Sequence, residues 1–261
     1  MHSTFSDGTL TPFELIERAK SLKLSGISIT DHDSVLAYTP DVFDFASEQE
    51  IELMTGVEFS CRFEETTIHI LAYNFDPLAD SIVTLCARHV QRRERRNKTI
   101  LERLRGKGII IDYDELVNSA KGAVGRPHIA NALIKKGIVS TIQQAFDQLI
   151  GDSSPCYVPG ESVTIPETLE VIHQAGGKAF IAHPHLVRKK KMVSRIVDLK
   201  IDGIEVYYAK FPPHRESGWL AMAKEKGLLI SGGSDFHGDY KEKNPMGCSW
   251  VNKEAFNKIC Q

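Results

Sequence analysis

Five short apolar runs in this chain each carry a histidine, an aspartate or a glutamate at or near their end. The runs are GISITDHD (26–33), LMTGVEFS (53–60), TIHILAY (67–73), KAFIAHPH (178–185) and LLISGGSDFH (228–237). Their β-branched and apolar residues predict strands. The carboxyl ends of the strands in an α/β barrel all open onto one face. The pattern therefore predicts that polar side chains from distant parts of the sequence converge at one mouth.

Length and composition are compatible with such a fold. A chain of 261 residues with 42% hydrophobic content can form one α/β barrel or two ordinary domains. It has no apolar run of about eighteen residues and no basic, then apolar, N-terminal segment, so we expect a cytoplasmic protein without a membrane span. The five cysteines show no Cys-x-x-Cys spacing, which argues against disulfides and a thiolate zinc site. Because the net charge is −2, a polyanionic ligand would have to be bound by local charge.

The sequence pattern divides the chain into three parts. Helices and strands alternate in residues 1–78 and again in 160–261, whereas 79–159 show helical patterns only. We therefore expect a barrel with an inserted helical lid domain, and parallel strand pairing through crossover connections. Expected helices span about 9–23, 41–50, 81–104, 113–120, 127–136 and 141–150, with later ones ending near 175, 197 and 226; expected strands start near 26 or span about 51–59, 68–75, 178–182, 203–208 and 228–232.

The acidic and imidazole side chains of the first two runs are candidate metal ligands, and some of them also have a structural explanation. Asp31, His32 and Asp33 follow one another at a strand end. Either aspartate alone is explained as well by a helix cap or a turn, an alternative that does not apply to His32. Glu58 lies in an otherwise apolar strand, where a carboxylate costs several kcal/mol unless it is paired or binds a cation. A buried ion pair is the alternative for Glu58.

Three further histidines occur in or just after predicted strands. His69 lies inside the run Ile-His-Ile-Leu, so it faces a polar centre or is an ordinary hydrogen-bonded core histidine. His183 precedes Pro184, which ends the strand and leaves this histidine at the barrel mouth. His185 is either a second ligand or a solvated loop residue.

The last run and the N-terminus complete the candidate set. Asp235 and His237 are two residues apart, which places them on one face of an extended chain. His2 and Asp7 alone would be unremarkable near an N-terminus. Together, imidazoles and carboxylates without thiolates favour manganese, iron or zinc over calcium or a lone magnesium. Eight ligands exceed the need of one ion, and clusters of two or three ions hydrolyse phosphoesters by generating hydroxide and clamping oxygens.

These motifs resemble a known family. A histidine before Ser-Asp-Gly, then Thr-Asp-His, Gly-Val-Glu, Ile-His-Ile, Ala-His-Pro and Ser-Asp-Phe-His occur in the order seen in the polymerase and histidinol phosphatase (PHP) superfamily. The resemblance covers nearly the whole chain. Gly125-Arg126-Pro127-His128 further resembles the branch of nucleoside 3′,5′-bisphosphate phosphatases and 5′-3′ exoribonucleases. The resemblance to the family implies a distorted (β/α)₇ TIM-like barrel that binds two or three divalent ions. Mn²⁺ is the expected ion, with Fe²⁺ or Zn²⁺ as alternatives.

The resemblance also implies roles for individual residues. The resemblance places the family's metal ligands on eight positions, with Glu58 as the bridging carboxylate and Asp235 essential for catalysis. The eight are His2, Asp7, His32, Glu58, His69, His183, Asp235 and His237. Arg126 and His128 would reach from the lid to the substrate phosphate, and His128 would either donate a hydrogen bond to it or protonate the leaving oxygen. The alternative for this pair is a helix start with Pro127 in the first turn. The expected reaction is attack by a metal-bridging hydroxide on a nucleotide phosphoester.

The substrate implied by the resemblance is a nucleoside 3′,5′-bisphosphate, the 5′ end of a short RNA, or both. We expect no membrane partner and no obligate protein partner. Two alternatives remain: a phosphatase of the histidinol-phosphate type, and a non-catalytic, metal-stabilised module that binds a partner or RNA. The basic run at 91–105 would serve the module as a binding face, although such a run is more often a solvated helix face.

Two positions depart from the family pattern. The family opens with Asp-x-His-x-His-Ser, whereas this chain opens Met1-His2-Ser3, so a first histidine would lie just before residue 1. We expect Met1 to be an internal methionine of a longer natural sequence. If the chain starts at Met1, one metal site lacks an imidazole and is empty, weak or completed by the Met1 amine. The second departure is His185, where relatives usually have glycine.

Overall fold

The computed structural model describes residues 1–64, 66–119, 124–152, 154–159, 163–187, 189–209, 211–241 and 243–261. The strands are β1 (Gly26–Ser28), β2 (Glu52–Met54), β3 (Gly56–Phe63), β4 (Thr66–Tyr73), β5 (Lys178–Ile181), β6 (Gly203–Tyr208) and β7 (Leu229–Gly233). The α-helices are α1 (Pro12–Ser21), α2 (Pro40–Glu48), α3 (Asp80–Arg105), α4 (Tyr113–Ser119), α5 (Arg126–Lys135), α6 (Ile142–Ala145), α7 (Ile165–Gln174), α8 (Lys190–Val197), α9 (Pro213–Lys226) and α10 (Lys253–Cys260). The chain is a mixed α/β protein.

The strands form two sheets, which meet beside Glu58 of β3. β1 and β2 pair in parallel, and the order of the larger sheet is β3-β4-β5-β6-β7. An isolated parallel bridge between His32 and Glu58 joins the two sheets. Glu58 N donates to Asp31 O over 3.1 Å, and Asp33 N donates to Glu58 O over 3.0 Å. The chain after β1 therefore lies directly beside the middle of β3.

The expectation of parallel pairing is confirmed for β5, β6 and β7 and is wrong for β4. β4 pairs antiparallel with both β3 and β5. The cause is the connection between Phe63 and Thr66, since a parallel pair needs a crossover of a dozen residues or more. As a result, the N-terminal half of β4 lies at the edge where the parallel strands have their carboxyl ends.

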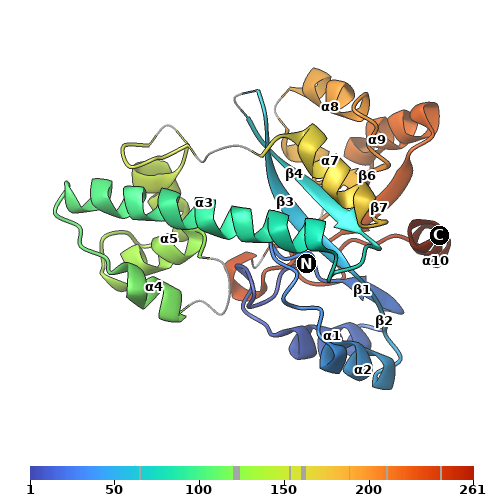
Figure 1. The fold of residues 1–261 in the computed structure, drawn as a ribbon, viewed down its shortest axis with the longest axis horizontal. Coiled ribbons are helices and arrows are strands. Elements are labelled where there is room, and N and C mark those ends of the chain that lie inside the picture. The colour runs from blue at the N-terminus through green and yellow to red at the C-terminus, as the bar shows by residue number, and fades with distance from the viewer. Residues whose placement is uncertain are drawn as a thin grey trace.

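Helices cover the sheets from outside and extend to one side (Figure 1). α7, α8 and α9 lie against the larger sheet, α1 and α2 pack beside β1 and β2, and α3 runs from the sheet to a helical lobe with α4 and α5. Thr11, Thr164 and Asn252 cap the starts of α1, α7 and α10 with side-chain hydrogen bonds. None of the described helices combines the length and apolarity that a membrane span requires.

The helical lobe has a hydrophobic cluster of its own. Ile100 and Leu104 from α3 pack with Ile129 and Leu133 from α5, and all four side chains are fully buried. The main cluster lies elsewhere, between the larger sheet and α7 to α9. α3 belongs to both regions, because Ile82 and Leu85 near its start contact the main cluster. This helix therefore connects the lobe to the sheet through continuous packing.

Most of the expected elements form, with local differences. The strand expected at 51–59 is broken at Thr55 into β2 and β3, and the helix expected at 141–150 becomes α6 followed by a π-helical turn at Phe146–Ile150. α10 was not expected. Its apolar residues include Ile259, which packs with Met54 and Phe180 at the lower end of the sheet.

Close packing at Gly203 gives a stability prediction. A Cβ atom built on Gly203 would lie 2.1 Å from Cε1 of Phe180, whereas nothing lies within 4 Å of a Cβ on Gly218. We expect G203A to lower the free energy of unfolding by about 1–3 kcal/mol through overpacking. G218A, inside α9, should raise it by about 0.5–1 kcal/mol. Urea denaturation of both variants measures this, and equal stability of the two would contradict the packing.

Candidate metal centre

All eight residues expected to bind metal lie together at the mouth of the strands. They come from six places that are far apart in sequence. The N-terminal segment supplies His2 and Asp7, the end of β1 supplies His32, β3 supplies Glu58, β4 supplies His69, the residue after β5 is His183, and the loop after β7 supplies Asp235 and His237. His69 reaches this group because β4 is antiparallel, which brings its N-terminal half to the mouth.

Glu58 lies at the middle of the group and is only 2% exposed. Its Oε1 atom is 2.6 Å from Nδ1 of His69 and 2.9 Å from Nε2 of His183. Its Oε2 atom is 3.0 Å from Nε2 of His2 and 3.8 Å from Nδ1 of His32. Four imidazoles therefore face one buried carboxylate.

Asp7 and Asp235 complete the carboxylates of the centre. Asp7 Oδ1 is 3.4 Å from Nε2 of His237, and Asp235 Oδ1 is 3.2 Å from Nε2 of His2. The ligand atoms form three groups, and within each group all atoms lie within 4.8 Å of one another. His2, His32 and Glu58 each belong to two of these groups. The groups are His2, Asp7, His32 and His237; His32, Glu58 and His69; and His2, Glu58 and Asp235.

The positions of the hydrogens on the histidine rings indicate whether the donor atoms of this set suit a cation. His237 Nδ1 is 2.9 Å from the carbonyl oxygen of Asp235, which can only accept, so Nδ1 carries the hydrogen. In the neutral ring, Nε2 then turns its lone pair toward the Asp7 carboxylate. His32 Nδ1 is buried without a hydrogen-bond partner in the part of the chain that is described. Lone pairs facing carboxylates at these distances are unfavourable unless a cation lies between them, so the donor set fits divalent metal ions.

The pKa shifts agree with a set of ligands in a buried, anionic environment. Burial lowers the pKa of His32 to about 4, which keeps this imidazole neutral and able to bind metal. Burial alone would raise the pKa of Glu58, but His32 and His69 outweigh it and hold the pKa well below its usual range. Burial also lowers the pKa of His2, but hydrogen bonds to Asp235 and Glu58 raise it to about 9. Without a metal ion, a proton on His2 thus offsets some of the carboxylate charge.

Hydrogen bonds fix the N-terminal segment that supplies His2 and Asp7. The buried carboxylate of Asp31 accepts from Ser3 N over 2.7 Å and from the hydroxyls of Ser3 and Ser6 over 2.5 Å each. A Cβ at Gly8 would lie 2.1 Å from the carbonyl oxygen of His2, so this turn requires glycine. Asp31 is therefore a support for the ligands rather than a member of the three ligand groups.

The Met1 amine binds the side chain of Thr30. It donates to Thr30 Oγ1 over 3.0 Å, and Met1 O accepts from Thr30 N over 2.7 Å. These two bonds place the segment beside β1.

Asp33 binds an arginine that the sequence interpretation missed. Asp33 is fully buried, and Arg93 of α3 donates to its Oδ2 through Nε, over 2.8 Å, and through Nη2. Arg93 Nη2 also donates to Ser60 Oγ over 2.9 Å. The sequence favours a solvated helix face for the run 91–105, with a binding face as the alternative, but one side of this run is turned inward. The spacing of Arg93 from the buried His89 and Asn97 by one helical turn each was the available signal.

The structure separates the two residues expected to grip phosphate. Burial lowers the pKa of His128, and the charge of the Asp7 carboxylate opposes that shift. Arg126 Nη1 instead donates to Asp152 Oδ1 over 3.0 Å, and its guanidinium lies over the rings of Phe146 and Tyr157 at 5.3 and 5.7 Å. The Arg126 side chain therefore contacts the helical lobe and not the ligand groups.

His185 is neither a member of the ligand groups nor a solvated loop residue. It is 8% exposed and stacks on Tyr208 and Phe211, with ring centroids 5.9 and 5.2 Å apart. Both of its ring nitrogens are buried without a hydrogen-bond partner among the described residues. Its contribution is packing against Tyr208.

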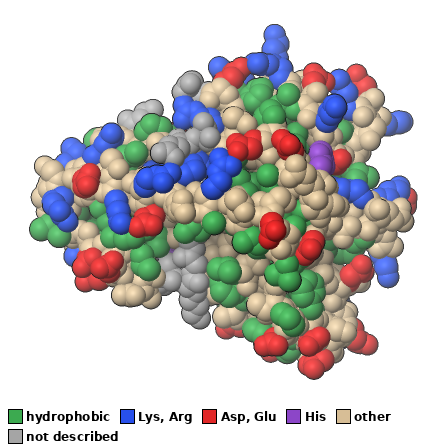
Figure 2. Space-filling model, viewed as in Figure 1, with side chains coloured by type: hydrophobic (Ala, Val, Ile, Leu, Met, Phe, Trp, Pro, Cys, Tyr) green, Lys and Arg blue, Asp and Glu red, His purple; other side chains and the backbone are tan. Residues whose placement is uncertain are grey.

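Arginine side chains adjoin the centre on the side of the helical lobe. Figure 2 shows Lys and Arg side chains gathered along the middle of α3. A small cavity there is lined by Asp33, Ser60, His89, Arg92, Arg93 and Arg96. Burial, followed by the nearby Arg93 and Arg126, lowers the pKa of Arg96 to about 9. Asp33 is the acidic side chain in this lining, so the cavity has an excess of positive charge.

Comparisons with known proteins agree with this geometry. The family model described as PHP domain matches residues 1–153. A 5′-3′ exoribonuclease of Haemophilus influenzae is 36% identical over 255 residues, which cover 96% of this chain and 90% of that protein. A 3′,5′-nucleoside bisphosphate phosphatase of Chromobacterium violaceum is 29% identical over 250 residues, 90% of this chain and 85% of the relative. A solved structure from Bifidobacterium adolescentis, described as a metal-dependent phosphoesterase, has a TM-score of 0.89 and 31% identity, covering 99% of this chain and 93% of the other.

Metal binding should stabilise the folded protein measurably. We expect Mn²⁺ added to chelator-treated protein to raise the free energy of unfolding by about 2.7 kcal/mol at 100 times its dissociation constant. For a chain of this size, that corresponds to an increase in Tm of roughly 5–10 °C. Scanning calorimetry with Mn²⁺, Fe²⁺, Zn²⁺ and Ca²⁺ measures the shift. Absence of a shift with every one of these ions would contradict the metal centre.

Proposed function

The chain belongs to the PHP domain family and hydrolyses phosphoester bonds, and we propose that its substrates are nucleotides. The proposed reactions are removal of the 3′-phosphate from nucleoside 3′,5′-bisphosphates and trimming of short RNA from the 5′ end. The names of the Haemophilus and Chromobacterium relatives support both. The family implies divalent metal ions, and we propose two or three, with Mn²⁺ as the first choice and Fe²⁺ or Zn²⁺ as alternatives.

The observation that carries this proposal is the convergence of five imidazoles and three carboxylates around Glu58. We assign metal binding to this whole set, in which Glu58 would be the central carboxylate because four of the imidazoles face it. Bound cations supply an activated water nucleophile and neutralise charge on the phosphoryl oxygens. The protein holds the ligands in place and excludes bulk water from Glu58 and His2, both of which are buried.

The proposed role of His128 is to donate a hydrogen bond to a phosphate oxygen of the substrate. This residue stands at the start of α5, and its Nδ1 accepts a hydrogen bond from Gly125 N over 3.0 Å. That bond fixes the tautomer of the neutral ring with the hydrogen on Nε2, the nitrogen that remains for the substrate. The influence of Asp7 on its pKa supports a position near the metal ligands.

The arginine cavity supports a substrate with more than one phosphate. Arg92, Arg93 and Arg96 line the cavity, in which Asp33 is the acidic side chain, and Arg126 lies near Arg96. Arg96 Nε is buried without a hydrogen-bond partner among the described residues. An anion bound here would receive charge-assisted hydrogen bonds. We propose that the cavity and Arg126, once it exchanges Asp152 for a phosphate, bind the phosphate that is not hydrolysed.

We also propose the domain division that the sequence suggested. Residues 1–78 and 160–261 would form the distorted barrel and residues 79–159 the inserted lid. The separate hydrophobic cluster of the lobe supports this division, as does the position of His128 at the boundary. A lid that carries Arg126 and His128 would bring substrate contacts to the metal centre from the opposite side.

Two other functions are less well supported. A phosphatase for a small metabolite with one phosphate, such as histidinol phosphate, leaves the arginine cavity without a use. A non-catalytic binding module would leave the ligand set without a use. The test is phosphate release by the Mn²⁺-loaded protein from adenosine 3′,5′-bisphosphate, histidinol phosphate and a short 5′-phosphorylated RNA. Preferred turnover of histidinol phosphate, or none of any substrate by metal-loaded protein, would favour these alternatives.

Neutral replacements of the carboxylates should abolish turnover without unfolding the chain. E58Q and D235N keep the shape of each side chain but remove the charge that binds cations. We expect turnover of the bisphosphate to fall on the order of a hundredfold or more, which corresponds to about 2.7 kcal/mol or more in barrier height. E14Q on the exposed surface of α1 is the control. Wild-type rates for E58Q and D235N in saturating Mn²⁺ would refute the assignment.

The arginine cavity should distinguish substrates by their number of phosphates. R96A should raise the KM for adenosine 3′,5′-bisphosphate about 10- to 100-fold, since a hydrogen bond to a charged group contributes about 1.5–3 kcal/mol. The KM for adenosine 3′-monophosphate should change little. R95A, which removes an exposed arginine of the same helix, is the matched control. Equal losses of R96A on both substrates would contradict the second phosphate site.

A further inference from the structure

β6 lies between two strands that lead into ligands but contributes no ligand of its own. Its neighbours in the sheet are β5, which is followed by His183, and β7, which is followed by Asp235 and His237. Two polar side chains of β6, Glu205 and Tyr208, nevertheless reach the centre. Each binds a ligand residue from a different neighbouring strand.

Glu205 holds the backbone of His183. The carboxylate is 5% exposed, and its Oε2 atom accepts a hydrogen bond from the backbone N–H of His183 over 2.6 Å. His183 has a φ of 30°, in the left-handed region that residues other than glycine seldom adopt. This bond stabilises a backbone turn that sends the imidazole back toward Glu58.

Tyr208 holds the side chain of Asp235. Its hydroxyl donates to Asp235 Oδ2 over 2.7 Å, while Asp235 Oδ1 faces His2 Nε2 at 3.2 Å. Asp235 also has a left-handed backbone, with a φ of 49°. The tyrosine thus occupies one carboxylate oxygen and leaves the other directed toward the ligand group. His185, stacked on Tyr208 at an interplanar angle of 21°, restrains the ring.

A β-bulge allows both side chains to face the centre. In a regular strand, residues three positions apart point to opposite faces. In β6, Glu205 pairs with Ser231 and Tyr207 pairs with Gly232, so Val206 is one extra residue against β7. Val206 and Tyr207 pack with the hydrophobic cluster that contains Trp219 of α9. Bulges beside active sites commonly redirect a side chain in this way.

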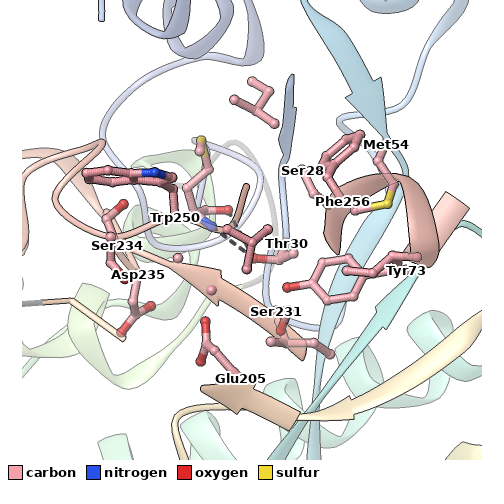
Figure 3. Close-up of a pocket in the computed structure, with 18 of the residues that line it drawn as sticks. Ser28, Thr30, Met54, Tyr73, Glu205, Ser231, Ser234, Asp235, Trp250 and Phe256 are labelled. Carbon is pink, nitrogen blue, oxygen red and sulfur yellow. Dashed lines mark hydrogen bonds between the residues drawn. The ribbon is translucent and has the colours of Figure 1, made fainter. Parts of the chain in front are cut away.

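A cavity next to the ligands explains why the hydrogen bonds from Glu205 and Tyr208 matter. A cavity of about 120 Å³ lies below Glu58, His183 and Asp235, and Glu205 and Ser231 line it. Figure 3 shows the carboxylates of Glu205 and Asp235 directed into this space, with the hydroxyl of Tyr73 on its other side. Because close packing does not surround the ligands on this side, hydrogen bonds from β6 have to fix their position.

We propose that β6 is a positioning strand of the metal centre, in which Glu205 and Tyr208, aligned by the bulge at Val206, hold His183 and Asp235 in ligand geometry. This inference rests on the proposed function, because it assumes that both residues bind metal. Supporting hydrogen bonds of this type commonly change metal affinity by about 10- to 100-fold when removed.

Four variants test the role: Y208F, E205A, E205Q and Y207F. Mn²⁺ affinity of chelator-treated protein is measured by isothermal titration, together with kcat and KM for the bisphosphate at several Mn²⁺ concentrations. We expect Y208F and E205A to bind Mn²⁺ about 10- to 100-fold more weakly, with activity that recovers as Mn²⁺ is raised. E205Q retains an acceptor oxygen for His183 N–H and should stay close to wild type. Y207F, changed in a residue that packs behind the sheet, is the matched control.

Wild-type Mn²⁺ affinity in both Y208F and E205A would overturn the inference, and so would equal weakening in Y207F. If E205A does not fold, Y208F, which lacks only one oxygen atom, decides the question. A wild-type protein that binds Mn²⁺ and releases phosphate while Y208F is unaffected contradicts the positioning role alone. A wild-type protein that binds no Mn²⁺ contradicts the proposed function itself.

Discussion

The buried carboxylate of Glu58 is the constraint on which the centre depends. A carboxylate inside an apolar strand is costly unless opposite charge surrounds it. Here four imidazoles from four other segments of the chain face its two oxygens. Each of those segments must end or turn at the same level of the sheet, so this one residue ties the N-terminus, β1, β4 and β5 to β3. The fold around it is arranged so that the charge is never left unpaired.

The sequence predicted which residues meet but not always how they do so. Most of the eight positions could be inferred because His, Asp and Glu are rare at the ends of apolar runs, whereas His2 and Asp7 depended on the resemblance to the family. All eight do lie together. His69 differs from the others, because it reaches the mouth from within an antiparallel strand, β4, and not from the end of a parallel strand. The short connection before β4 could have predicted this antiparallel pairing. The helical patterns were also sufficient to predict α1 to α9 approximately, because their periodic apolar faces pack on one sheet or one lobe.

Contacts made by long side chains could not be predicted in the same way. Arg93 belongs to a run that is typical of a solvated helix face, and Arg126 was expected to bind phosphate. In the structure Arg93 binds the buried Asp33 and Arg126 binds Asp152. A side chain with four rotatable bonds can reach several partners, and the choice depends on tertiary packing that a helical pattern does not specify. The bulge in β6 could not be predicted from the sequence pattern either. It depends on one extra residue, Val206, that no alternation of apolar and polar residues reveals.

The centre therefore combines two opposite kinds of electrostatic environment. The ligands form a region of carboxylates and imidazoles suited to cations, whereas the adjoining cavity between β3 and α3 is lined by arginines suited to anions. Asp33 lies at the boundary: its backbone bonds to Glu58, and its carboxylate binds Arg93. A short RNA or a nucleoside bisphosphate carries more than one phosphate along the molecule, so one phosphate can meet the cations while another meets the arginines. A substrate with a single phosphate and a cationic side chain would place a positive charge next to arginines, which is unfavourable. The arrangement of charge, more than the shape of the cavity, thus favours a nucleotide.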